Sequence, residues 1–201
     1  MLGASWTEIL DIFFRWFHVF FGILWIGLLY FFNFVNGPFT KTLDADAKKK
    51  VVPELMPRAL FFFRWGAMLT FIFGLILFFL NYSPNNWANF NGVRGHWISL
   101  GMLFGTIMWF NVWFIIWPAQ RKIINGVKTG SPAAPEIANR AMWASKMNVY
   151  LSIPLVFSML AAGSLSPFKH DDWYWYVIVI VIGFAAANGL YKRAAKVSTE
   201  V

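Results

Sequence analysis

The sequence predicts an all-α fold, an integral membrane bundle of five transmembrane helices. Hydrophobic residues make up 59% of the chain and charged residues only 13%, whereas about a quarter of a typical soluble domain is charged. Several apolar runs reach the roughly 20 residues that a helix needs to cross a bilayer. Short polar segments separate these runs, so we expect a single membrane domain over residues 1–201.

Start and stop signals give the expected bounds of the first three helices, which are 6–35, 57–82 and 96–117. Ser5 and Glu8 have the spacing of a capping box at the start of the first helix, and Pro38, after Asn and Gly, is expected to end it. Pro57 suits the first turn of the second helix, and Pro118 is expected to stop the third. Residues 43–52, in the first loop, have the pattern of a short interfacial helix.

The last two helices are expected over 135–163 and 172–191. The fourth begins at Pro135 with a polar extension and becomes apolar from Met142 onward. Asp171 or Asp172 is the expected cap of the fifth.

The distribution of basic residues predicts the orientation. Lysine and arginine concentrate in the loop between helices one and two, in the loop between helices three and four, and at the C-terminus. Cytoplasmic loops carry such an excess. We therefore expect the N-terminus outside, the C-terminus in the cytoplasm, and a multi-pass protein of the bacterial inner (plasma) membrane. The net charge of +8 is explained by topology and by contact with membrane lipids, so no nucleic-acid partner is expected.

The chain contains no cysteine. This excludes disulfides, iron–sulfur clusters held by thiolates and the covalent attachment of c-type haem. Any haem must therefore be held non-covalently.

The three histidines are the candidates for metal chemistry. His18 lies inside the first apolar helix, where a coordinating side chain is costly and usually has a task or a partner. His96 opens the third helix, which runs in the same direction, so both imidazoles are expected near the outer surface. This arrangement predicts a haem b held by two histidines, with His170 as the substitute for His96. The alternative for His18 is a hydrogen bond to another helix.

Further residues are expected to contact the haem. Gly22 lies one helical turn after His18 and leaves room for a flat ring, and Trp25 continues the same face. Arg15, on that face too, is placed to pair with a propionate, or else with lipid headgroups. Ser99, in the third helix, is a polar candidate for the lining of the site.

Arg64 is a second unusual residue, inside the second helix. We expect it either to form a polar cluster with Asn148 and Tyr150 of the fourth helix or to extend toward headgroups.

Two pairs of small residues are expected to permit close helix contacts: Gly101 with Gly105, and Gly183 with Ala187.

Three segments carry a resemblance to a known family: residues 15–27 (RWFHVFFGILWIG), 111–120 (NVWFIIWPAQ) and 148–154 (NVYLSIP). They resemble the membrane domain of PuuD-type urate oxidases, the urate oxidase N-terminal family. More distantly, the chain is similar to HemJ protoporphyrinogen oxidases and CopD copper-resistance proteins. The resemblance implies a helical bundle that binds b-type haem, with His18 and His96 as ligands. The chain departs from the family pattern at Met147, where a histidine is expected.

The resemblance and the histidines lead to three candidate functions. The first is electron transfer by haem b, with a periplasmic cytochrome c or quinol as redox partner. The second is oxidation of a small organic substrate, urate or a protoporphyrinogen. The third is a non-catalytic accessory role in a larger membrane complex or a homo-oligomer.

Overall fold

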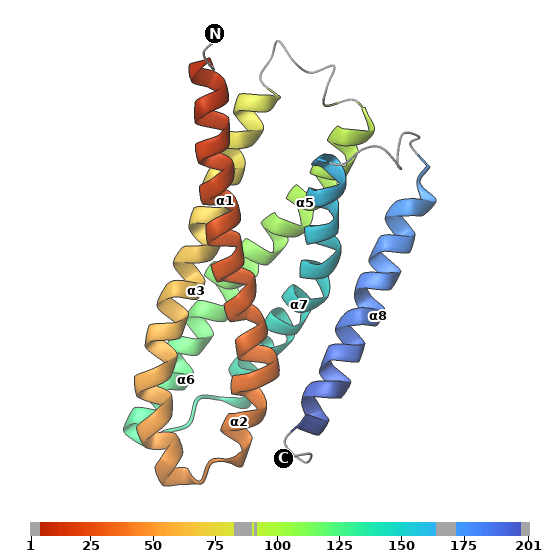
Figure 1. The fold of residues 1–201 in the computed structure, drawn as a ribbon. Helices are drawn as coiled ribbons and strands as arrows, with labels where there is room; N and C mark the ends of the chain where they lie inside the picture. The colour runs from red at the N-terminus through yellow and green to blue at the C-terminus, as the bar shows by residue number, and fades with distance from the viewer. Residues whose placement is uncertain (1–4, 83–89, 91, 164–171, 198–201) are drawn as a thin grey trace.

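The computed structural model describes residues 5–82, 90, 92–163 and 172–197, and it confirms the all-α prediction (Figure 1). Five of its helices are long and apolar enough to cross a membrane. In chain order the elements are α1 (Trp6–Tyr30), the π-helical segment η1 (Phe31–Asn36), α2 (Gly37–Thr42), α3 (Ala45–Asn81), α5 (Val93–Phe110), the π-helical segment η3 (Asn111–Ile116), α6 (Trp117–Thr129), α7 (Pro135–Gly163) and α8 (Tyr174–Val197).

The first span begins as predicted but ends later. The capping box is present, because the Ser5 side chain accepts from the Glu8 amide and the Glu8 side chain accepts from the Ser5 amide. The predicted stop before Pro38 is wrong, since the helix continues through η1 and α2 as far as Thr42. A proline ring clashes with the carbonyl four residues earlier and lacks an N–H. The wider π-turns just before Pro38 accommodate both effects.

The third long helix also passes a proline by way of a π-helical segment. Instead of ending at residue 117, it passes through η3 and continues as α6. Trp117, directly before Pro118, donates its N–H to Val112, five residues back. Pro38 and Pro118 therefore both follow a π-helical segment that keeps the helix continuous. The predicted stop at Pro118 is wrong.

The second span begins much earlier than predicted. Asp44 caps α3 by accepting from the Ala47 amide at 2.7 Å, so the helix starts at Ala45. Pro57 lies inside the helix rather than in its first turn, and the stretch expected as a separate interfacial helix is the first part of α3. The bounds of α7 agree with the prediction, and α8 begins at Tyr174 and ends at Val197.

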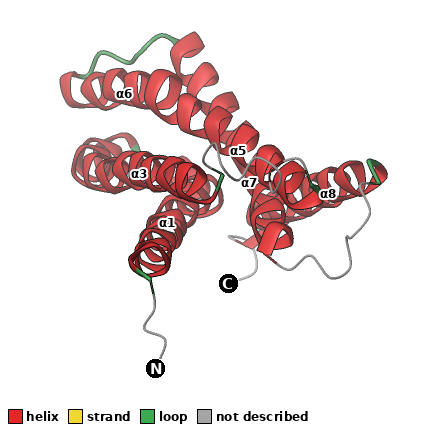
Figure 2. Cartoon of the chain, turned by 90° about the horizontal axis from the view of Figure 1, so that it is seen from above, coloured by secondary structure: helices red, strands yellow, loops and turns green. Residues whose placement is uncertain are grey.

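The helices pack mainly as neighbouring pairs: α1 on α3, α5 on α7, and α7 on α8. Viewed from above, α1 and α3 lie together and α8 lies at the edge beyond α7 (Figure 2). The turn between α2 and α3, the turn between α6 and α7 and the end of α8 share one end of the bundle, while α1 begins at the other (Figure 1). The three basic segments are therefore gathered at one end. We refer to it as the basic end.

A core of large apolar side chains fills the centre of the bundle. Its most deeply buried members come from α1, α3, α5, η3 and α7: Leu29, Phe63, Met108, Val112 and Val149.

Two of the predicted glycine contacts are very close. A Cβ on Gly101 would lie 2.7 Å from the Met159 methyl, and one on Gly183 would lie 2.7 Å from the Pro154 ring. The small residues therefore permit the close helix contacts that their spacing predicts.

Candidate functional site

His18 is held against α3 by a hydrogen bond to the main chain. Its Nδ1 lies 2.8 Å from the carbonyl oxygen of Thr70. A carbonyl can only accept, so Nδ1 carries the proton. In a neutral imidazole the other nitrogen, Nε2, then has the lone pair. No described residue hydrogen-bonds to Nε2. This is the state of a histidine that is ready to bind a metal through Nε2.

A stripe of small residues on α3 makes this contact possible. Gly66, Thr70 and Gly74 are spaced by four residues and lie on one face of the helix. In an α-helix the carbonyl of residue 70 points toward residue 74. A Cβ on Gly74 would lie 2.9 Å from Cε1 of His18 and 3.2 Å from Nδ1. The missing side chain at Gly74 therefore leaves the space that the imidazole occupies.

The rest of the predicted haem face of α1 also packs on this stripe. A Cβ on Gly22 would lie 3.8 Å from the Thr70 methyl, and one on Gly66 would lie 3.3 Å from the backbone nitrogen of Trp25. The Trp25 side chain is buried in the core. In this structure Gly22 and Trp25 thus serve the contact between α1 and α3. Their contact with a haem stays a prediction.

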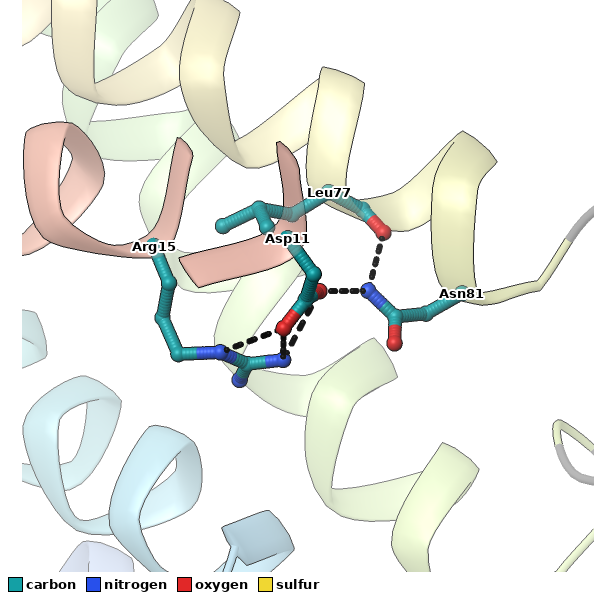
Figure 3. A network of polar contacts seen from close by, with 4 residues as sticks. All are labelled: Asp11, Arg15, Leu77 and Asn81. Carbon is teal, nitrogen blue, oxygen red and sulfur yellow. Dashed lines mark hydrogen bonds and ion pairs between the residues drawn. The ribbon is translucent and has the colours of Figure 1, made fainter. Parts of the chain in front are cut away.

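Arg15 is engaged by a neighbour on its own helix. Its guanidinium donates to both carboxylate oxygens of Asp11, over 2.7–3.1 Å. Asp11 also accepts from the Asn81 amide at 2.7 Å, and the same amide donates to the Leu77 carbonyl (Figure 3). This network joins the N-terminal part of α1 to the C-terminal end of α3. A guanidinium has five donors, so a further contact with a propionate stays a prediction.

Two of the other predicted site residues, His96 and Ser99, belong to α5. His96 is exposed in the first turn of α5, a helix that packs mainly on α7 rather than on α1. Ser99 is partly buried and donates its hydroxyl to the Gly95 carbonyl at 2.8 Å. His170 lies outside the described residues. His18 lies roughly 18 Å along α1 from its start and His96 roughly 5 Å along α5, at 1.5 Å per residue. The choice of second ligand stays a prediction.

Polar side chains of α7 form contacts with η3, α5 and α8 that the sequence did not predict. Asn111 donates to the Asn148 side chain at 2.8 Å, and Asn148 donates to the Met108 carbonyl at 3.0 Å. Tyr150 bonds instead to Asn188 of α8. The predicted cluster of Arg64 with Asn148 and Tyr150 is therefore wrong.

A second polar group joins η1 to α7 and α8. Asn33 donates to Ser145 at 2.8 Å and accepts from Tyr191 at 2.9 Å. Tyr30 lies 2.9 Å from the Ser152 hydroxyl. Because two members of these clusters, Asn33 and Asn111, come from the π-helical segments, those segments fix the position of α7 as well as accommodating the prolines.

The residues that position His18 were not predicted from the sequence. The signal was present as the four-residue spacing of Gly66, Thr70 and Gly74. Asp11 gave a similar signal, since it lies one turn before Arg15 on the same face. Within the described ranges no three His, Asp or Glu side chains gather as they would around a metal ion. His18 has a side-chain nitrogen that could bind a metal, because its Nδ1 is already bonded to the Thr70 carbonyl and Nε2 keeps its lone pair.

Comparison with known protein families identifies a relationship for the second half of the chain. A model of the urate oxidase N-terminal family matches residues 85–198, more than half of the chain. The matched segment contains His96, Asn111 and Asn148, whereas His18 precedes it. No curated protein and no solved structure matches.

Proposed function

Since the chain belongs to the urate oxidase N-terminal family, we propose that it is a membrane protein that binds haem b through His18 and transfers electrons. The state of the His18 imidazole is the observation that carries this proposal. Its Nδ1 proton is fixed by the Thr70 carbonyl at 2.8 Å, and Nε2 is left with a lone pair for iron. Ligating histidines usually have such a partner, which fixes their orientation and raises their basicity.

The surrounding residues support part of this site. His18 would hold the iron through Nε2, and His96 or His170 would supply the second ligand. Asp11 holds Arg15 one turn away from His18, at the outer end of α1, with donors to spare for a propionate. Gly22 faces Thr70 of α3 and the Nδ1 edge of His18 is bonded to α3, so we expect the cofactor on the Nε2 side of the imidazole. When bound, haem b supplies a one-electron carrier.

The protein's own contribution is to orient one imidazole within an apolar helix. The chain neighbours of His18, Phe17 and Val19, are apolar, and α3 holds its Nδ1. A low-dielectric setting of this kind influences the potential of an iron centre. Oxidation of a small organic substrate would need, in addition, a place for the substrate beside the cofactor. Electron transfer does not, so it is the simpler function for this set of residues.

Optical spectra of the purified full-length chain test the proposal. We expect a Soret band, a b-type α band on reduction, and no response to carbon monoxide if both axial positions are filled. His18→Ala should abolish the bands. His96→Ala and His170→Ala, compared side by side, should identify the second ligand. A folded wild-type chain that binds no haem would contradict the proposal, and carbon monoxide binding would favour the oxidase.

A further inference from the structure

Arg64 lies in a cage of tryptophans between α3 and the third span. Its Cζ is 4.0 Å from the ring centroid of Trp117, 5.2 Å from that of Trp113 and 5.9 Å from that of Trp65. A guanidinium within about 6 Å of an indole centroid makes a cation–π contact. We call Arg64 and these three indoles the Arg64 cage.

The cage contains hydrogen-bond donors without acceptors. Nε of Arg64 and Nε1 of Trp113 are buried and have no partner. Both atoms can only donate. Among the described residues the ion pairs are Arg15 with Asp11 and Arg58 with Glu54, so no acid neutralises Arg64. A buried donor without an acceptor is costly. We therefore expect an acceptor from outside the chain to bind in the cage.

A second cation faces the same ring. Arg121 lies one turn after Trp117, and its Cζ is 5.9 Å from the Trp117 centroid. Its side chain is exposed, while that of Arg64 is partly buried. Two guanidinium groups near one indole repel each other unless an anion lies between them. Arginine suits phosphate in particular, because its planar fork binds two oxygens at once.

An apolar hollow adjoins the cage and indicates where the anion comes from. The hollow lies between α1 and α3, has a volume of about 280 Å³, and is lined only by apolar residues, among them Phe21, Leu24, Phe62 and Trp65. Trp65 belongs to both the hollow and the cage. A free phosphate would use the cage alone, whereas a lipid has an acyl chain that would fill the hollow as well.

We propose that Arg64 and Arg121 bind the phosphate group of an anionic membrane lipid, with an acyl chain in the hollow beside Trp65. Arg121 lies on α6, which leads to the basic end of the bundle, the end expected in the cytoplasm. The inference depends on the membrane placement given above and is independent of haem.

Lipid binding to the purified full-length chain in detergent tests the site. The probes are phosphatidylglycerol, phosphatidylcholine and inorganic phosphate, and the readouts are the thermal midpoint and the lipid retained per chain in native mass spectrometry. We expect phosphatidylglycerol to be retained and to raise the midpoint, with little effect of the other two. Arg64→Gln and Arg121→Gln should each weaken this binding about tenfold, the loss expected for one charge-assisted contact.

Arg58→Gln is the matched control. It removes the same charge from the same helix, but Arg58 is paired with Glu54 at 2.7 Å, so lipid retention should be unchanged. Should Arg64→Gln fail to fold, the exposed Arg121 still tests the site. Equal lipid retention by the Arg121→Gln and Arg58→Gln variants would overturn the proposal. So would equal stabilisation by inorganic phosphate, which would indicate a soluble anion. Haem spectra of the same samples show separately whether the haem proposal holds.

Discussion

Replacing Gly74 by alanine should displace His18 without changing a single polar group. The new Cβ would lie 2.9 Å from Cε1 of the imidazole, whereas carbon atoms in contact prefer about 3.5–4.0 Å. The ring must therefore move by roughly 0.5–1 Å. The bond from Nδ1 to the Thr70 carbonyl is now 2.8 Å, so a movement of that size takes it beyond the usual limit of about 3.2 Å.

Loss of this bond should weaken haem binding about 10- to 100-fold, the usual effect of removing the partner of a ligating histidine. The assay is titration of the haem-free chain with haem, followed at the Soret band. Gly27→Ala is the control, because a Cβ on Gly27 meets nothing within 4 Å. The reasoning is refuted if the two variants bind haem equally well. A lower thermal midpoint of Gly74→Ala with unchanged haem affinity would show that the contact is purely structural.

Two further predictions concern the packing of α7, and thermal unfolding in detergent checks both. Gly183→Ala should cost about 1–3 kcal/mol, because overpacking against a rigid ring is expensive and the new Cβ would lie 2.7 Å from Cδ of Pro154. Gly189→Ala on the same helix meets nothing within 4 Å and should be neutral or stabilising, so equal midpoints would contradict the packing. Asn148→Ala should cost about 1–3 kcal/mol, since it removes the oxygen that accepts from the Asn111 amide and the side-chain donor to the Met108 carbonyl; an unchanged midpoint would show that these bonds are dispensable.

The number and kind of spans could be predicted from the sequence because they depend on composition and length alone. The capping box at Ser5 and the bounds of α7 followed from local signals in the same way. The predicted stops at Pro38 and Pro118 failed because a π-helical segment precedes each of these two prolines and accommodates its ring. Local rules carry no information on whether the preceding turn can widen.

For the candidate site the sequence identified the unusual residues but not their partners. His18 and Arg15 stood out because polar side chains are rare in apolar helices. The partners, Thr70 and Asp11, did not, because one contributes a backbone carbonyl, which every residue has, and the other is an ordinary acid near a helix start. Pairing between α1 and α3 depends on how two distant segments pack, and spacing along one helix does not determine that.

Rescue of a His18→Gly variant by free imidazole tests the central claim most directly. The truncation leaves a gap beside the Thr70 carbonyl, into which added imidazole can bind and donate the same hydrogen bond. We predict that the variant lacks the low-spin haem spectrum of the wild-type chain and recovers it when imidazole is added. A variant that keeps the wild-type spectrum without imidazole would contradict the assignment of His18 as the iron ligand.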